Sequence, residues 1–126
     1  NELFVLAKKN CKVLFFSYEN FHKKCKKNCK FHETLVTSLP DLILKKSIML
    51  NTRIEVLSQR SIRDKLLKYF DIMSKRSLTK SFNLSISLTD LADYLSIDRS
   101  AMMRELKNLQ DDRIIKKEKN KITLLV

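Results

Sequence analysis

The sequence predicts a mainly helical α+β fold with small β elements, in which a long helix precedes a winged helix-turn-helix domain. Two adjacent rows of apolar residues recur every seven positions between residues 35 and 57, a spacing typical of a long helix with a wide apolar stripe. Two short amphipathic patterns follow, separated by a three-residue break at 96–98. Finally, "RIIKKE" and "KITLLV" flank "KN" as a closing hairpin. Helix, tight turn, helix and hairpin in this order indicate the winged helix-turn-helix.

The composition favours an anionic partner. The 126 residues carry a net charge of +12, a balance that usually indicates nucleic acid or, less often, a membrane surface. Apolar residues make up 44% of the chain, enough for a core. No apolar run approaches the roughly 20 residues of a membrane span, and no signal peptide is visible. We therefore expect a cytoplasmic protein with no membrane partner.

Three further features of the composition limit the possibilities. The chain has no glycine, which excludes a glycine-rich phosphate-binding loop and leaves tight turns to Asn, Asp, Ser and Lys. Three cysteines, an odd number, favour free thiols over a disulfide framework. The first residue is Asn rather than Met, so we expect a fragment of a longer protein.

The first 35 residues contain short apolar runs and a lysine-rich segment. "LFVLA" (3–7) and "CKVLFFSY" (11–18) are predicted to be two strands of a hairpin whose sheet lies largely outside this chain. Cys11 is then expected to be buried in a strand. Residues 19–35 are compatible with a short helix.

The apolar rows predict a helix that pairs with a second copy of itself. Lys46 and Arg53 interrupt the stripe. Charged residues at these positions suit a partly solvent-exposed contact between two helices. The alternative interpretation, a fully buried helix of a monomer, accommodates them less well. Pro40 lacks an N–H, so a helix begins near it or kinks there. The residues expected to form the dimer seam are Leu35, Val36, Leu39, Leu42, Ile43, Met49, Leu50, Ile54 and Leu57.

The helices of the C-terminal part are marked by capping residues. Residues 61–73 form an amphipathic pattern, and 82–87 alternate as a short strand. Ser87 followed by Asp90 has the form of a capping box that opens a helix. Its inward residues are expected to be Leu91, Ala92 and Leu95.

The next helix carries the candidate DNA-binding side chains. Asp98 can cap its N-terminus, and Ala101, Met102, Leu106 and Leu109 are expected to face inward. The outward positions lie mostly in the first two turns, the part of a recognition helix that reaches base edges, and arginine can bind guanine through two hydrogen bonds. The outward residues are Arg99, Ser100, Met103, Arg104 and Lys107.

Lysines of the hairpin, together with Thr89 at a helix N-terminus, are candidate phosphate contacts. Such contacts are blind to sequence and sensitive to salt. A merely solvated side chain is at least as good an interpretation for any single lysine. The hairpin candidates are Lys116, Lys117, Lys119 and Lys121.

A cysteine and histidine cluster lies in "HKKCKKNCKFH" (22–32). On a helix its four members, His22, Cys25, Cys29 and His32, share one face over about 15 Å. One metal ion would then take only a neighbouring subset, such as Cys25, Cys29 and His32, unless the helix breaks at Asn28. The neighbouring lysines favour thiolates, which suits metal binding or redox sensing. Zinc and iron–sulfur sites usually have four ligands, and ordinary packing or surface positions are the alternative.

The stretches "RIEVLSQRSIRDKLLKYF", "LTDLADYLSIDRSAMMRELKNLQDDRIIK" and "KITLLV" resemble the Crp/Fnr family of bacterial transcription regulators. In this resemblance, residues 1–32 look like the last strands of the family's truncated effector-sensing, cyclic-nucleotide-binding-like β-roll. Residues 33–59 look like its dimerisation helix, and 60–126 like its winged helix-turn-helix domain. Most of an effector pocket would lie outside this chain, so the effector or cofactor stays unknown.

The resemblance implies a homodimer that binds a near-palindromic operator in double-stranded DNA, with RNA polymerase as a further partner. Arg99 and Arg104 match recognition-helix arginines that contact phosphates or bases. Ser100 stands where many members have a base-reading Glu, Ser96 where the turn usually has Gly, and Asp98 where a Ser is usual. These departures affect the operator sequence and the affinity rather than the fold.

Two rival classes fit less well. A winged helix used only for protein contacts predicts an acidic or apolar recognition face, whereas this face carries two arginines. A cysteine enzyme needs a histidine oriented by a carboxylate, and the only histidines lie among lysines, with Glu33 as the only evident candidate. We therefore predict a DNA-binding regulator and not an enzyme.

Overall fold

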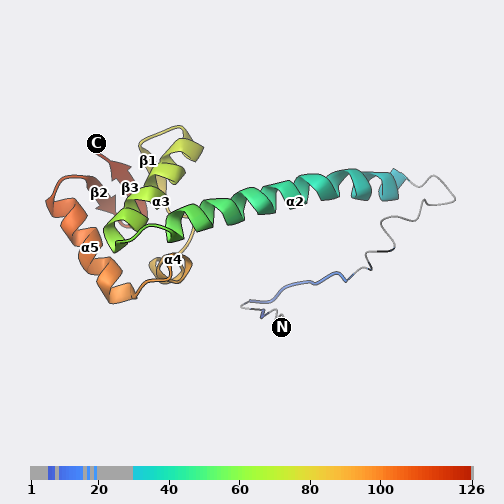
Figure 1. The fold of residues 1–126 in the computed structure, drawn as a ribbon, viewed down its shortest axis with the longest axis horizontal. Helices are drawn as coiled ribbons and strands as arrows, with labels where there is room; N and C mark the ends of the chain where they lie inside the picture. Colours follow the sequence, from blue (N-terminus) through green and yellow to red (C-terminus); the bar gives the residue numbers. More distant parts are fainter. Residues whose placement is uncertain (1–5, 8, 16, 18, 20–29, 126) are drawn as a thin grey trace. The chain divides into compact units, whose positions relative to one another are not determined.

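The structure is a computed structural model that describes residues 6–7, 9–15, 17, 19 and 30–125. The chain divides into two compact units, Asn1–Leu44 and Lys45–Val126. In Figure 1, α2 is the long helix, and the elements from α3 to β3 follow it along the chain. The predicted fold class is confirmed: the described residues are mainly helical, with one small antiparallel sheet.

Helix α2 spans Lys30–Leu57 and includes Pro40. It begins ten residues before Pro40, so the first of the two expected outcomes, a helix that begins near this proline rather than one that kinks there, is not observed. Pro40 has no N–H to donate to the carbonyl of Val36, which is the local cost of placing proline inside a helix.

The predicted N-terminal hairpin is not present in the residues that the structure describes. Residues 11–15 have no strand structure and are exposed. Cys11 is an exposed free thiol rather than a buried strand residue. A strand is stable only where a neighbouring strand bonds its backbone, and the described part of the chain supplies none here. The remaining positions of the expected strands, and residues 20–29, lie outside the described residues.

The unit Lys45–Val126 contains three further helices and a three-stranded sheet. The helices are α3 (Ile62–Ser77), α4 (Leu88–Leu95) and α5 (Arg99–Asp111), and the strands are β1 (Ser81–Asn83), β2 (Ile115–Glu118) and β3 (Lys121–Leu124). The strand order is β1-β3-β2, with both pairings antiparallel. Strands β2 and β3 form the predicted hairpin, the wing, in which Lys117 pairs with Ile122.

The core of this unit is apolar and draws on every element. The predicted inward residues of α4 and α5 are buried, except that Ala101 is only half-buried. Val56, at the end of α2, is fully buried in the same core. The fully buried side chains are Val56, Leu66, Phe70, Leu91, Leu95, Met102, Leu106, Leu109, Ile115 and Ile122.

The strand predicted at 82–87 is shorter than expected. Strand β1 ends at Asn83, since the wing pairs with it over only three residues. The N–H of Leu84 still donates to the carbonyl oxygen of Asn120 at 2.8 Å. Leu84 is buried although it lies outside the strand. The alternating apolar residues of 82–87 therefore indicated which side chains are buried, but not where the strand ends.

Among the described residues, four adopt the left-handed backbone region that glycine usually occupies: Leu78, Ser96, Arg113 and Lys119, with φ between 51° and 56°. Ser and Lys were predicted to take this role. Leu78 and Arg113 were not, because a γ-branched or long side chain carries no turn signal of its own.

Candidate nucleic-acid interface

Helix α4 begins with Ser87 as its N-cap, as the pairing of Ser87 with Asp90 predicted. The Ser87 hydroxyl accepts from the N–H of Asp90 at 3.1 Å and donates to the Asp90 carboxylate at 2.7 Å. The first bond satisfies one of the N–H groups that lack a partner within the first turn, and the second holds the Asp90 side chain against the cap residue. Thr89 is exposed in this turn, which leaves it accessible to a phosphate group.

The turn between α4 and α5 is closed by Ser96 in the left-handed region, with φ 53°. The Ser96 N–H donates to the carbonyl of Asp93, and the Ile97 N–H donates to the carbonyl of Ala92 at 3.1 Å. The ammonium group of Lys65 in α3 donates a hydrogen bond to the carbonyl oxygen of Leu95 at 3.4 Å. These bonds satisfy the last carbonyls of α4 and hold the angle at which α5 leaves the turn.

Asp98 caps the N-terminus of α5. Its carboxylate accepts from the N–H of Ala101 at 2.8 Å and from the hydroxyl of Ser100. The Ser100 hydroxyl, then the Ala101 N–H and the charge of Arg104 lower the pKa of Asp98 below its usual value. Because the Ser100 proton is engaged, this hydroxyl can only accept a hydrogen bond from a further group in the present geometry.

The predicted outward residues of α5 are all exposed: Arg99, Ser100, Met103, Arg104 and Lys107. Within the part of the chain that the structure describes, the side chains of Arg99, Arg104 and Lys107 form no hydrogen bond or ion pair. The structure thus presents three unpaired cations on one helix. Cations that make no internal pairs are available to phosphates and base edges.

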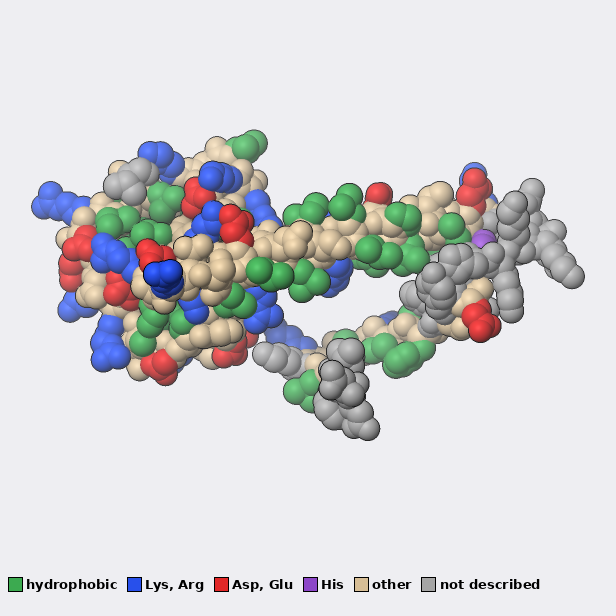
Figure 2. Space-filling view, viewed as in Figure 1, with side chains coloured by type: hydrophobic (Ala, Val, Ile, Leu, Met, Phe, Trp, Pro, Cys, Tyr) green, Lys and Arg blue, Asp and Glu red, His purple; other side chains and the backbone are tan. Residues whose placement is uncertain are grey.

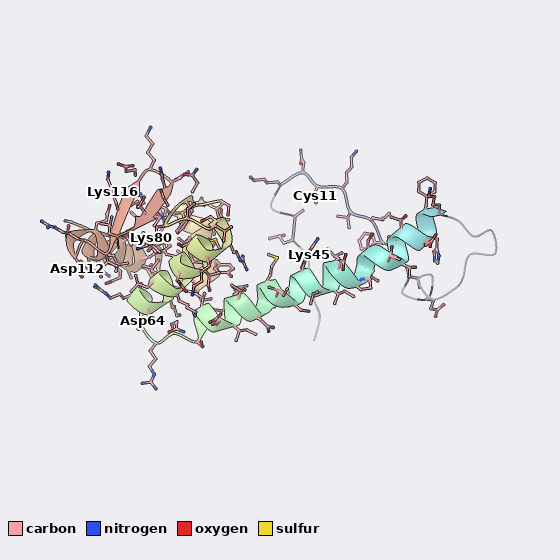
Figure 3. The ribbon with its side chains drawn as sticks, turned by 90° about the horizontal axis from the view of Figure 1, so that it is seen from above. Cys11, Lys45, Asp64, Lys80, Asp112 and Lys116 are labelled. Atoms are coloured by element: carbon pink, nitrogen blue, oxygen red, sulfur yellow. The ribbon has the colours of Figure 1, made fainter. Side chains whose placement is uncertain are left out.

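Two acidic residues, Glu105 of α5 and Asp112 at its end, are paired with Arg63 of α3, which sequence reasoning missed. Its guanidinium pairs with Glu105 at 3.2 Å and with Asp112 at the end of α5. Figure 3 labels Asp112, together with Lys116 on the neighbouring strand β2. The pairing holds α5 to α3 and partly neutralises two carboxylates that would repel DNA.

The four wing lysines are not equivalent. Lys116 pairs with Glu118 at 2.7 Å and lowers the pKa of that carboxyl group. Lys117 is half-buried, and its N–H donates to the Gln110 side chain at 3.3 Å. Lys119 lies in the hairpin turn and Lys121 begins β3, and both are exposed. Lys119 and Lys121 are therefore the wing cations best placed to meet an anion.

Helix α2 exposes most of its predicted seam residues. Figure 2 shows the hydrophobic side chains along it. Leu39 and Leu57 are half-buried, and the other seven predicted seam residues are exposed, among them Leu50 at 61% and Ile54 at 64%. Exposed apolar side chains in such number on one helix indicate a surface that another element covers.

The predicted metal site is only partly described. Cys25 and Cys29 lie outside the described residues, while His32 is half-buried in the first turn of α2. Among the described residues, no group of three or more His, Cys, Asp or Glu side chains is arranged to hold a metal ion.

The order of helices, turn and wing, with unpaired cations on α5, defines a winged helix-turn-helix DNA-binding module. In agreement with this class, residues 64–125 match the family model of the Crp-like helix-turn-helix domain. This region is a Crp-like helix-turn-helix domain, the DNA-binding part of a transcription regulator. A search of curated proteins gave no match. In the described residues, no helix has both the length and the apolar character needed to cross a membrane.

Proposed function

We propose that this chain is the dimerising and DNA-binding part of a Crp/Fnr-type transcription regulator, which binds a near-palindromic operator as a homodimer. The observation that carries the proposal is the unpaired pair of arginines, Arg99 and Arg104, on an Asp98-capped helix. Such a helix enters the major groove with its N-terminal half against the base edges.

The cations divide into two roles. Arg104 lies one and a half turns into α5, so its long guanidinium can reach the groove floor and bind guanine through two hydrogen bonds. Lys119 and Lys121 lie on the wing and reach only the backbone. Thr89 and Lys107 also contact the DNA backbone. Lys116 does so as well once its ammonium group leaves Glu118 and pairs with a phosphate.

The dimer is supported by the apolar rows of α2. A second copy of the same helix would cover these rows, so no other partner is needed. The two-fold axis of such a dimer requires an operator with two related half-sites. Control by an effector bound to an N-terminal domain, and contact with RNA polymerase in the cytoplasm, are supported by the family resemblance.

The test is selection of binding sequences from random duplexes with the 126-residue chain. The proposal expects enrichment of an inverted repeat whose half-sites lie about one helical turn, 10–10.5 base pairs, or a multiple of it apart. Binding of the selected duplex should exceed that of a scrambled duplex by 10³-fold or more. Equal binding to both duplexes, or enrichment of a single unrepeated site, would contradict it.

A further inference from the structure

Met103 is an exposed apolar side chain on a face that is otherwise polar. It is 39% exposed, whereas its neighbour Met102 is fully buried in the core. The other exposed residues in this half of α5 are Arg99, Ser100 and Arg104. The core of the domain does not need Met103, because Met102, Leu106 and Leu109 already provide the inward face of α5.

The position of Met103 places it among the groups that face DNA in the proposed function. It follows Arg99 by four residues and Ser100 by three, so the three side chains share one side of the helix. It lies about 6 Å along the helix axis from Arg99 at 1.5 Å per residue. Arg104, the next residue in sequence, projects about 100° further around the helix, so an apolar group and a guanidinium leave the second turn in different directions and can meet different bases.

Only one base presents an apolar group in the major groove. Thymine carries a 5-methyl group there, while the other base edges present hydrogen-bond donors and acceptors. The methionine thioether cannot donate a hydrogen bond and packs readily on irregular apolar surfaces. Ser100, the other uncharged candidate, donates its proton to Asp98 in this geometry, so its hydroxyl is engaged within the helix cap rather than directed to a base.

We infer that Met103 is a specificity-determining residue that packs on the 5-methyl group of a thymine in each half-site. The inference rests on the proposed function. It assigns the two adjacent side chains different tasks: Arg104 binds a base edge through hydrogen bonds, and Met103 selects a neighbouring thymine by apolar contact. In each half-site, Met103 then contacts the methyl group of one thymine and not its hydrogen-bonding groups.

The experiment replaces each thymine of the selected operator by uracil, one position at a time and in both half-sites. Uracil lacks only the methyl group, so base pairing is retained. At one position, binding should weaken about fourfold per half-site, the loss expected for one buried methyl group. In Met103→Ala the thymine and uracil duplexes should bind equally at this position, while Met103→Leu should retain the preference.

Lys107→Ala is the matched control, because Lys107 lies on the same face one turn later and, in the proposed function, contacts phosphate rather than a base. This variant should bind every duplex more weakly and keep the full preference for thymine. Two results would overturn the inference while leaving the proposed function intact: no uracil substitution weakens binding, or Met103→Ala keeps the preference. If the chain binds no duplex, the proposed function fails and the inference fails with it.

Discussion

The guanidinium carbon of Arg53 lies 5.3 Å from the centre of the Tyr94 ring, so a cation near the end of α2 contacts an aromatic side chain of α4. Tyr94 in turn packs against Tyr69 of α3, with ring centres 5.7 Å apart. Lys68 of α3 also pairs with Glu55 of α2. The last turns of α2 therefore pack against α3 and α4 of the unit Lys45–Val126. Arg53, which interrupts the apolar stripe, contributes to this packing through its contact with Tyr94.

The first prediction is that Arg53 and Tyr94 stabilise the domain jointly. A cation over an aromatic ring at an exposed site contributes about 0.5–1 kcal/mol. A double-mutant cycle with Arg53→Leu and Tyr94→Leu, followed by urea unfolding, should give a coupling energy of this size. The control pair Arg53→Leu and Lys116→Leu lacks a common contact and should be additive. Additive effects for the Arg53–Tyr94 pair would show that the contact does not stabilise the fold.

The second prediction concerns Ser96, which adopts φ 53° without being glycine. A residue with a Cβ is strained in this region, so Ser96→Gly should raise the free energy of unfolding by up to about 1 kcal/mol. Lys107→Gly, inside α5 at ordinary helical angles, should lower it by roughly 0.5–1 kcal/mol. Thermal unfolding followed by circular dichroism distinguishes the two. A loss of stability in Ser96→Gly would mean that the turn is not strained.

The third prediction is a loss of stability in acid that depends on Asp98. Its pKa is lowered in the folded state, so its contribution is present above the usual carboxyl pKa and is lost as the pH falls through the folded value. Asp98→Asn keeps an acceptor for the helix N-terminus but not this charge. The difference in unfolding temperature between the wild type and Asp98→Asn should therefore be constant above the usual carboxyl pKa of about 3.9 and shrink as the pH falls below it.

Ser100→Ala is the companion variant, because the Ser100 hydroxyl is the first cause of the lowered pKa. It should show a smaller acid-dependent loss than the wild type. The prediction fails if the gap between the wild type and Asp98→Asn is the same at every pH.

Local patterns in the sequence predicted the caps and the inward faces of α4 and α5, because a cap and its partner lie within one helical turn. Ser87 with Asp90, and Asp98 with Ala101, are three residues apart. Arg63 meets partners 42 and 49 residues away. No local pattern indicates such a contact, since it depends on how α3 and α5 pack.

The same limit applies to the apolar rows and to the N-terminal hairpin. Periodicity predicted α2 but did not show that Val56, in one of these rows, belongs to the core of the DNA-binding unit. Apolar runs such as 11–15 predicted strands, yet a strand depends on a neighbour that its own residues do not specify. The outward residues of α5 were predictable because helical geometry alone fixes which side chains oppose the buried face.

The fourth prediction is that the chain dimerises through the apolar rows of α2. Leu50→Asp places a charge in the proposed seam, where burial without a partner is costly, and should convert the dimer to a monomer in light scattering after size exclusion. Asn51→Asp is the matched control: it adds the same charge one residue later, on the side of the helix away from the rows, and should leave the dimer intact. A wild-type chain that is monomeric at tens of micromolar, or two variants that behave alike, would contradict the proposed seam.

The last prediction separates base reading from phosphate binding. Arg104→Ala should cost about 1–3 kcal/mol on the selected operator and relax discrimination at one position of each half-site, because it removes a base contact. Lys119→Ala should instead weaken binding to all sequences alike and reduce the slope of log affinity against log salt by roughly one unit, since one phosphate contact is lost. Titration of both variants against operator and scrambled duplexes at several salt concentrations measures the two effects separately. If Arg104→Ala loses affinity equally for both duplexes, Arg104 binds phosphate, and the selection of sequence by α5 has to come from its other exposed side chains.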